Sequence, residues 1–376
     1  MPAKGESVDA DVVIAGGGVI GTAIAWRAAR SGLSVTLVDP GSDTDKASLV
    51  AAGMLGPVSE SVFGEQDLLN LNLLAIDRFP GFNAELEAAA GLTTGLRTEG
   101  TLAVAYDSDD LAALARLTAF RQSIGLKAEA LDARQCRKLE PFLAPATRGG
   151  VLAAGDLSVD NRRYLAALSA AAAKEGVRHL TGTVTGVTEG EVILGSRRLT
   201  AAGVVIAAGW ATSKIDGVPD EIRKALRPVK GQILRLRHPR NMPNIATRSI
   251  RAIVGGRDIY LVPRADGELV AGATQEERDD TDPTAGAIHD LLRDASTALP
   301  AISELILAEI NVGLRPGTQD NGPIVGRTRE QRLIVATGHF RNGILLSAAT
   351  ADAVAALLVG GEPHPAWAPF GPGRFG

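Results

Sequence analysis

The sequence predicts an α/β fold in which a discontinuous domain carries a parallel sheet and a second domain carries an antiparallel sheet. Apolar strand, glycine turn and helix patterns occur near both ends of the chain, at residues 11–31 and 333–358. Strand-like stretches lie between them, at 102–106, 232–237, 259–263 and 268–273. With 376 residues the chain is long enough for two hydrophobic cores.

The first strand-turn-helix pattern is a complete βαβ unit. Residues 11–15 form an apolar strand, 16–21 a glycine turn, 22–31 an Ala-rich helix and 34–38 a second strand that ends in Asp39 and Pro40. The turn has the Gly-x-Gly-x-x-Gly spacing of dinucleotide-binding proteins at Gly16, Gly18 and Gly21. We expect the helix N-terminus to bind phosphate groups and Asp39 to accept hydrogen bonds from ribose hydroxyl groups. NAD and FAD remain equally possible on this motif alone.

Three later segments extend this domain along the chain. A polar loop at 41–45 leads to small residues at 47–56, against which a large flat ligand could lie. Residues 201–211 read as a buried strand that ends in glycine at Gly209. Residues 333–358 read as a strand, a turn at Gly338 and Gly343 and an apolar helix, whose N-terminus could face a negatively charged ring system.

The predicted domain boundaries follow from these segments. Residues 1–80, 149–211 and 311–376 are assigned to the cofactor domain, and residues 81–148 and 212–310 to the substrate domain. The segment ending at residue 312 is predicted to be helix-like and to lead into Arg315. Residues 165–173 are predicted as a helix face, residues 276–283 as a solvated loop and residues 360–376 as a tail rich in Gly and Pro.

Composition excludes several classes of partner. The net charge is −4 and the Lys and Arg residues are scattered, so we expect neither nucleic acid nor membrane as a partner. The longest apolar run, residues 12–26, is too short to span a bilayer, and the N-terminus lacks the apolar core of a signal peptide. The five histidines show no ligand spacing, and no metal is expected.

The single cysteine, Cys136, lies in a charged run and is interpreted as an incidental surface thiol. One cysteine cannot form an intrachain disulfide, which favours a reducing, cytoplasmic setting.

The chain resembles the D-amino-acid-oxidase-type flavoproteins, and within them the glycine oxidases of the thiamine-biosynthesis kind. The stretches that carry the resemblance occur in the family's order between about residues 10 and 360. They are Val13–Gly21, Ala51–Gly56, Pro228–Gly231, Tyr260–Arg264, Gly272–Thr274, Gly313–Thr318 and Gly338–Leu346.

The resemblance implies FAD as the cofactor, bound in a Rossmann-like domain. The binding is expected to be non-covalent, because Cys136 lies in none of the cofactor motifs. Arg315, Tyr260, Arg341 and Met54 would face the substrate. The residues expected at the cofactor are Gly16, Gly18, Val19, Ile20, Gly21, Asp39, Pro40, Ala47, Ser48, Ala52, Gly53, Met54, Val184, Gly209, His339, Phe340, Arg341, Asn342, Gly343, Ile344 and Leu345.

The implied reaction is oxidation of glycine or a small amino acid by hydride transfer to FAD, with O2 as the electron acceptor. In this interpretation Arg315 holds the substrate carboxylate, and the imine is hydrolysed or used for thiazole synthesis. The resemblance also suggests a homo-oligomer, a homotetramer. His339 could pack against the flavin or titrate.

Three positions depart from the family pattern. Asn161 follows Asp160 where the family often has an acid followed by proline, and Ser347 and Ala348 stand where alanine and proline are usual. We expect only local backbone effects at both places. Gln275 replaces an apolar pocket residue, which leaves the preferred substrate open.

Three other functions stay open from the sequence. The first is a flavin dehydrogenase that passes electrons to a quinone or another carrier. The second is an NAD-dependent dehydrogenase, which the C-terminal strand-turn-helix disfavours. The third is a cofactor-binding protein without activity, which the grouping of Arg315, Tyr260 and Arg341 disfavours.

Overall fold

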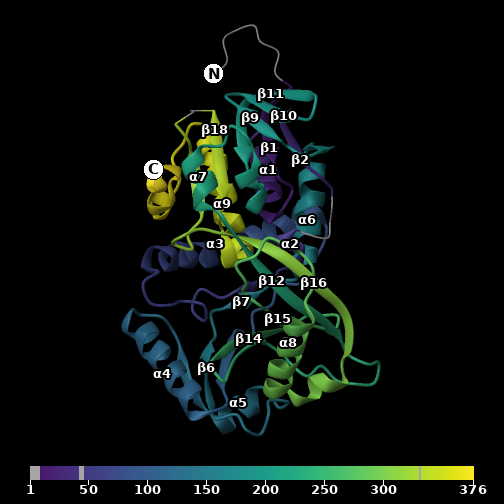
Figure 1. The fold of residues 1–376 in the computed structure, drawn as a ribbon, viewed down its shortest axis with the longest axis vertical. Helices are drawn as coiled ribbons and strands as arrows, with labels where there is room; N and C mark the ends of the chain where they lie inside the picture. The colour runs from purple at the N-terminus through teal and green to yellow at the C-terminus, as the bar shows by residue number, and fades with distance from the viewer. Residues whose placement is uncertain (1–8, 42–45, 330–331) are drawn as a thin grey trace.

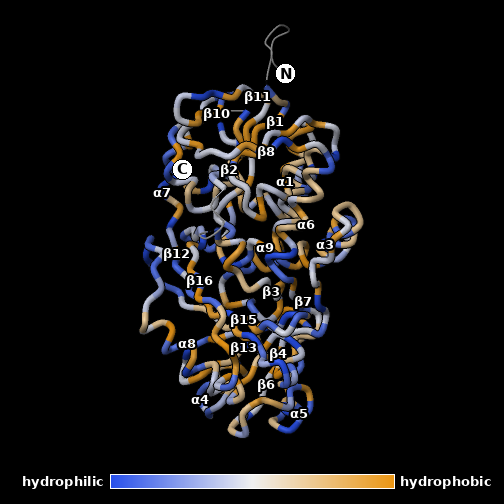
Figure 2. Tube along the Cα trace, turned by 90° about the vertical axis from the view of Figure 1, so that its right-hand side faces the viewer, coloured by the Kyte–Doolittle hydropathy of each residue, from blue (hydrophilic) through white to orange (hydrophobic). Residues whose placement is uncertain are grey.

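The computed structural model describes residues 9–41, 46–329 and 332–376. The chain is elongated, with one sheet and its helices in the upper half of Figure 1 and a second sheet in the lower half. Hydrophobic segments run through the strands of both halves (Figure 2). The first eight residues and most of the expected polar loop at 41–45 lie outside the described residues.

The upper sheet has the strand order β17-β18-β11-β1-β2-β8. All neighbouring pairs in it are parallel except β17 with β18. A small hairpin, β9 with β10, extends the sheet from β11. The bounds are β1 Ala10–Ala15, β2 Val35–Asp39, β8 Arg178–Thr181, β9 Gly186–Thr188, β10 Glu191–Leu194, β11 Arg197–Ile206, β17 Ile324–Arg327 and β18 Leu333–Thr337.

Both faces of the upper sheet are covered, which explains why its central strands are apolar throughout. One face packs against a helical layer in which α1 touches α9 and α6. The other face packs against Ile215 and Ile222, which lie near and in the short helix α7. The bounds are α1 Val19–Arg30, α3 Gln66–Ala90, α6 Asn161–Lys174, α7 Asp220–Ala225, α9 Gly343–Leu358 and the 3-10 helix η1 Gly209–Lys214.

The lower sheet has the strand order β16-β12-β15-β14-β13-β4-β6-β5. It was predicted to be antiparallel, but β13 pairs with β4 in parallel, so the sheet is mixed. The long connection between these two strands allows parallel pairing, whereas the hairpin-linked strands must be antiparallel. The bounds are β4 Thr101–Ala105, β5 Glu129–Asp132, β6 Gly149–Ala153, β12 Arg227–Arg237, β13 Ser249–Val254, β14 Arg257–Pro263, β15 Glu268–Gly272 and β16 Ile306–Gly317.

Short elements complete the lower half and the junction with the upper half. Helix α8 packs on β12, β13, β14 and β15, over the apolar core of that face. The bounds are α4 Ser108–Ser123, α5 Ala133–Leu139, α8 Ala285–Ala298, η2 Pro300–Glu304, and at the junction α2 Ala47–Val50, β3 Met54–Leu55, β7 Leu157–Ser158 and η3 Phe340–Asn342.

Three of the four predicted domain boundaries, at residues 80, 211 and 310, fall inside elements. Residue 80 lies inside α3, which continues through Pro80 because Phe79, Phe82 and Leu86 form one buried face. The prediction of a helix-like segment before Arg315 is wrong, because residues 306–317 form strand β16, which pairs with β12 along its length. Strand β6 starts at residue 149 but belongs to the lower sheet. The two-domain division itself stays a prediction.

Two further local expectations are corrected by packing, and a third is confirmed. The C-terminal segment is not a loose tail, because Trp367 and Phe370 are buried in the upper core within and beside the 3-10 helices η4 Pro365–Phe370 and η5 Pro372–Phe375. Cys136 is not a surface thiol: it is fully buried, and burial raises its pKa to about 11. The solvated loop predicted at 276–283 is confirmed, since no residue in it is buried, and Asp280 ties it to β12 by binding the buried Lys230.

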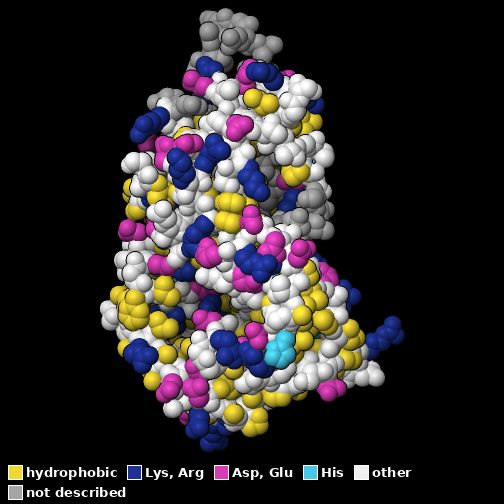
Figure 3. All heavy atoms as spheres, in the orientation of Figure 1, with side chains coloured by type: hydrophobic (Ala, Val, Ile, Leu, Met, Phe, Trp, Pro, Cys, Tyr) yellow, Lys and Arg dark blue, Asp and Glu magenta, His cyan; other side chains and the backbone are white. Residues whose placement is uncertain are grey.

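Surface charge agrees with the composition. On the face shown in Figure 3, Lys and Arg side chains are intermixed with Asp and Glu side chains and do not form a large basic area. Among the described residues, no helix is both long and apolar enough to cross a bilayer.

Candidate active site

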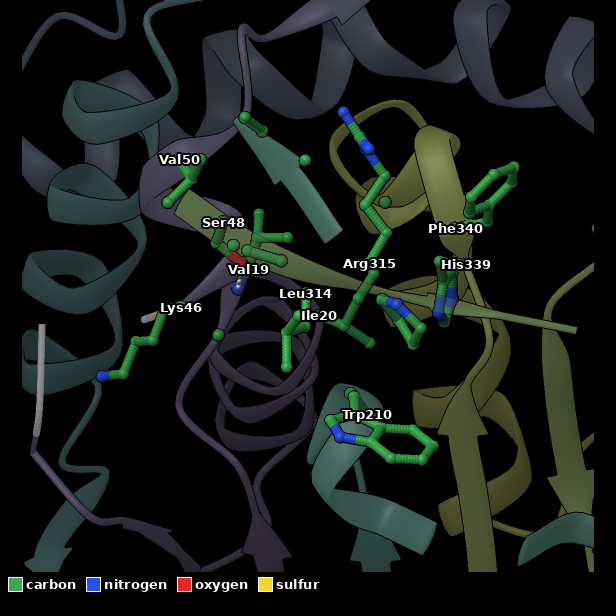
Figure 4. A pocket seen from close by; sticks show the side chains of 18 of the residues that line it. Val19, Ile20, Lys46, Ser48, Val50, Trp210, Leu314, Arg315, His339 and Phe340 are labelled. Carbon is green, nitrogen blue, oxygen red and sulfur yellow. Dashed lines mark hydrogen bonds between the residues drawn. The ribbon is translucent and has the colours of Figure 1, made fainter. Parts of the chain in front are cut away.

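A cavity of about 730 Å³ lies where the two halves of the molecule meet. Its walls come from the glycine turn and α1, from the 46–54 segment, from η1, from strands β12, β14 and β16 and from the start of α9. In Figure 4, Lys46, Ser48 and Val50 lie on one side and His339 and Phe340 on the other, with Arg315 between them. Its size is in the range of cofactor and ligand pockets.

One end of the cavity is built by the glycine turn after β1. Gly16 has φ 109°, and an added Cβ there would lie 2.4 Å from the carbonyl oxygen of Ala207. At Gly21 a Cβ would lie 1.8 Å from the carbonyl oxygen of Gly16, so α1 could not pack so closely on the strand. The helix starts at Val19, three residues earlier than predicted, with Gly18 as its N-cap. This arrangement exposes backbone N–H groups at a helix N-terminus, which suits a phosphate ligand.

Asp39 closes the same end from the last position of β2. Its carboxylate accepts hydrogen bonds from Gly17 N (2.7 Å) and Gly41 N (2.9 Å), and Lys46 Nζ lies 2.7 Å away. Burial alone would raise the pKa of Asp39, but the Lys46 ammonium and these N–H groups outweigh burial and lower it. The side chain is therefore a fixed anionic acceptor at the rim of the cavity, which fits the predicted ribose contact.

The other end of the cavity is formed by η3 and the N-terminus of α9. His339 is 3% exposed, its Nε2 lies 3.0 Å from Thr350 Oγ1, and burial lowers its pKa to about 3. The imidazole is therefore neutral at physiological pH, and of its two predicted roles the structure favours packing over titration. Gly343 and Ile344, the first residues of α9, line the cavity.

The segment at 47–56, predicted to lie under a flat ligand, is fastened by a buried polar cluster. Asn161 Nδ2 donates to Ser48 O (2.8 Å), and Asn161 Oδ1 accepts from Arg235 Nη2 (3.2 Å) and Arg264 Nη2 (3.1 Å). Arg264 also donates to Ala52 O (2.6 Å). Asn161 thus acts well beyond its local backbone, contrary to our expectation for this departure from the family pattern.

The second departure, at Ser347, likewise has more than a local effect. Ser347 Oγ lies 2.9 Å from the Tyr164 hydroxyl and donates to Ile344 O (2.7 Å). Both side chains are buried, so this contact fixes α9 against α6.

Arg315 enters the cavity from β16 and lies across the neighbouring strand. Its guanidinium covers Gly231 of β12, where an added Cβ would lie 2.4–2.5 Å from the guanidinium atoms. Arg315 Nη1 donates to Thr274 O (3.1 Å), and no carboxylate among the described residues pairs with it. Tyr260 lies beside Arg315: burial raises the tyrosine pKa while the guanidinium opposes that shift. Together they offer a cation and a neutral hydroxyl donor.

Two further arginines line the cavity, and each has a carboxylate partner. Arg341 Nη2, in η3, forms an ion pair with Glu65. Arg251, in β13, donates to Glu60 Oε1 (2.8 Å). Both partners come from the 56–65 segment, between β3 and α3. Arg341 therefore does not approach a substrate as an unpaired cation.

Most predicted site residues line this one cavity. Gly21, Asn342 and Leu345 do not: Gly21 packs α1 on the glycine turn, and the other two are buried near the start of α9. The predicted residues that line the cavity are Gly16, Gly18, Val19, Ile20, Asp39, Pro40, Ala47, Ser48, Ala52, Gly53, Met54, Val184, Gly209, Tyr260, Arg315, His339, Phe340, Arg341, Gly343 and Ile344.

Several lining residues were not predicted. Gly231 stands in a stretch that carries the family resemblance, but its role depends on where Arg315 folds over it. Glu60 and Arg251 lie 191 positions apart in the chain, so no spacing rule could pair them. Trp210 follows Gly209, which begins η1 rather than ending the strand as predicted, and its indole Nε1 is buried without a hydrogen-bond partner among the described residues.

These features fit an elongated dinucleotide. The glycine turn and Asp39 form one end of the cavity, and the small residues of 47–54 form its floor. The space beside Gly18 is open to a ligand, since a Cβ built there would meet only Ser48 Oγ, at 3.2 Å. No group of three or more His, Cys, Asp or Glu side chains suited to a metal ion occurs in the part of the chain that the structure describes.

Comparisons with known proteins identify the family of the chain. The family model of FAD dependent oxidoreductases, DAO, matches residues 11–357. The chain is 32% identical to a glycine oxidase from Bacillus licheniformis, with 95% of each chain covered. It is also 32% identical to the bifunctional protein ThiO/ThiG of Trichormus variabilis, covering 97% of this chain and 55% of that protein. The chain thus spans about half the length of the bifunctional relatives.

Solved structures give the same result. Glycine oxidase from Geobacillus kaustophilus superposes with a TM-score of 0.89 at 30% identity, covering 98% of this chain and 99% of that chain. Iminodiacetate oxidase from Chelativorans sp. BNC1 has a TM-score of 0.83 at 23% identity, which shows a shared fold. The predicted fold class and family are confirmed, and the chain belongs to the FAD-dependent oxidoreductase family, with FAD as its cofactor.

Proposed function

We propose that the protein oxidises glycine or another small amino acid, with O2 as the electron acceptor and hydrogen peroxide as a product. The resulting imine is hydrolysed to glyoxylate or another keto acid and ammonia, or is used for thiazole synthesis. The observation that carries this proposal is Arg315, a cavity-lining guanidinium without a carboxylate partner among the described residues. Relatives named glycine oxidase and ThiO/ThiG support the substrate class.

Arg315 and Tyr260 bind the substrate carboxylate in this proposal. A planar guanidinium can hold a carboxylate through two parallel hydrogen bonds, and the Tyr260 hydroxyl adds a third. The raised pKa of Tyr260 keeps that hydroxyl protonated, so it remains a donor at physiological pH. Fixing the carboxylate orients the Cα–H bond of the substrate, which is a positioning effect.

Bound FAD supplies the redox chemistry, by accepting a hydride and passing two electrons to the acceptor. The substrate enters this step with a neutral amine, loses a hydride from Cα and becomes an iminium that water hydrolyses. Its amine needs no base in the protein, and the neutral His339 is not required for proton transfer. The protein orients the substrate and excludes water.

Other parts of the proposal concern the cofactor link and the assembly. Cys136 is buried beneath the lower sheet and does not line the cavity, which supports non-covalent FAD. A homotetramer and a cytoplasmic location are proposed from resemblance to the family. Gel filtration of the purified protein tests the first, and fractionation of cells tests the second.

The test is an absorbance spectrum of the purified protein, recorded before and after anaerobic addition of glycine and again after readmission of O2. We expect the flavin bands to bleach and then to return with formation of peroxide. Bands that bleach but return only with a quinone would replace the oxidase with a dehydrogenase. If the flavin bands bleach with neither glycine nor sarcosine nor D-alanine, the proposed substrate class is contradicted.

A further inference from the structure

The segment at 56–65 supplies the counter-ions for two of the three arginines that line the cavity. Glu60 pairs with Arg251, and Glu65 pairs with Arg341. The third arginine, Arg315, has no carboxylate partner among the described residues; it contacts the carbonyl oxygen of Thr274 and the Tyr260 hydroxyl. As folded, the cavity therefore presents one uncompensated guanidinium.

The Glu60 pair lies beside the predicted substrate contacts. Arg251 stands opposite Tyr260 in the register of β13 and β14, so the two side chains share one face of the sheet. Arg251 and Glu60 are only 24% and 17% exposed, and both contribute to the electrostatic environment of the Tyr260 hydroxyl. This partly buried pair is screened less by solvent than a surface pair.

The Glu65 pair is held on both carboxylate oxygens. Oε2 accepts from Arg341, and Oε1 accepts from Asn321 Nδ2 (2.9 Å). Glu65 is 18% exposed and Arg341 26% exposed, so this pair is also largely shielded.

The 56–65 segment that carries both glutamates is itself held by hydrogen bonds to Asp156 and Arg121. Asp156 accepts from Val58 N (3.1 Å) and Ser59 N (3.0 Å). Arg121 donates to Ser59 O (2.7 Å) and Ser61 O (3.1 Å). These contacts fix residues 58–61, and with them the backbone that carries Glu60, whereas Glu65 is held by Asn321 and Arg341.

We propose that Glu60 and Glu65 determine substrate specificity by restricting the cavity to amino acids with a single carboxylate. This inference rests on the proposed function, because it takes Arg315 as the ligand of the substrate carboxylate. A second carboxylate would enter beside Glu60, which lines the cavity, or beside Arg341, which Glu65 already neutralises, and like charges repel. The exposed side chains of Asp258 and Asp279 also line the cavity, together with an exposed cation, Lys214.

The test measures binding of acetate and malonate to the yellow holoprotein through the change in the flavin spectrum. In the wild type we expect acetate to bind at least about tenfold more tightly than malonate. In Glu60→Gln and Glu65→Gln the freed guanidinium should shift this ratio toward malonate by about tenfold, which corresponds to about 1.4 kcal/mol. Glu60→Asp and Glu65→Asp keep the charge and should keep most of the wild-type ratio.

Glu309→Gln is the matched control, because it removes the same charge from an arginine pair, Arg162 with Glu309, that does not line the cavity. Equal binding of acetate and malonate by the wild type would overturn the inference. So would Gln variants whose ratio equals that of Glu309→Gln.

A second measurement separates this inference from the proposed function. The ratio of kcat/KM for glycine to that for iminodiacetate should fall in the two Gln variants and not in Glu309→Gln. One outcome would contradict the proposed function but not this inference. In it, no amine reduces the flavin, while the ratio of acetate to malonate affinity still changes in the Gln variants.

Discussion

At the residue scale, the site depends on a long side chain placed over a glycine. Arg315 crosses Gly231 so closely that no side chain larger than hydrogen fits beneath it. The register explains the approach: Gly231 pairs with Gly313 on β16, two positions before Arg315. The sequence contains both residues, but only the pairing of β12 with β16 brings them together.

Arg315→Ala should weaken carboxylate binding while FAD stays bound. A charge-assisted contact contributes about 1.5–3 kcal/mol, so KM for the amino acid should rise about 10- to 150-fold. The measurement is steady-state kinetics together with the flavin content of the purified variant. A colourless protein, or one with unchanged KM, would contradict the role of Arg315.

Gly231→Ala should disturb the same contact without removing the charge. Gly231 does not have a positive φ, so alanine is compatible with its backbone, but the added Cβ would meet the guanidinium at 2.4 Å. We expect KM to rise about tenfold, with little change in the free energy of unfolding. Gly155→Ala is the control, since its Cβ would meet nothing within 4 Å. Equal KM values for the two variants would refute the placement of Arg315.

At the scale of elements, α9 combines a binding role with a stability role. The first residues of α9 line the cavity. His339, which precedes the helix, forms a hydrogen bond with Thr350 inside it. Burial lowers the pKa of His339 to about 3 from its ordinary 6.5. As pH falls below 6.5, the unfolded chain takes up this proton before the folded chain does.

The free energy of unfolding should therefore decrease as pH falls from 6.5 toward about 3. One proton contributes a slope of about 1.4 kcal/mol per pH unit, which is about 2 kcal/mol between pH 6.5 and about pH 5. His339→Gln lacks this group, so urea unfolding should show a shallower pH dependence for the variant. Identical slopes in the two proteins would show that His339 is protonated in the folded state.

The conformation of β16 could not be predicted from its own sequence. Ile306, Leu307 and Ile310 have the spacing of a helix face, yet the segment that contains them is a strand. In the structure these side chains are 55%, 43% and 36% exposed on an edge strand. Backbone pairing with β12 determines the conformation here, and such long-range pairing leaves no periodic signal in a short window.

At the scale of the whole molecule, the two halves are joined by buried polar contacts. Asn161 belongs to α6 in the upper half, and its side chain meets Arg235 and Arg264 from the lower sheet. All three are at most 3% exposed. Their hydrogen bonds also fasten the floor of the cavity, through Ser48 O and Ala52 O.

Asn161→Ala should destabilise the fold and loosen FAD together. The substitution leaves buried guanidinium donors without this acceptor, which costs about 1–3 kcal/mol in the free energy of unfolding. Thermal unfolding of the holoprotein and the dissociation constant of FAD are the two measurements. Asn70→Ala, on the exposed face of α3, serves as control. A variant with wild-type stability and wild-type FAD affinity would show that the cluster does not join the halves.

The sequence by itself determined the family, the cofactor and the α/β class, and most of the site residues it predicted line the cavity. These depend on local patterns: a glycine turn between a strand and a helix has one favoured geometry, and short motifs keep their order along the chain. Only the tertiary structure decided which charges are compensated. Glu60 meets Arg251 and Glu65 meets Arg341 across 191 and 276 positions, and ion pairs form through space rather than along the chain.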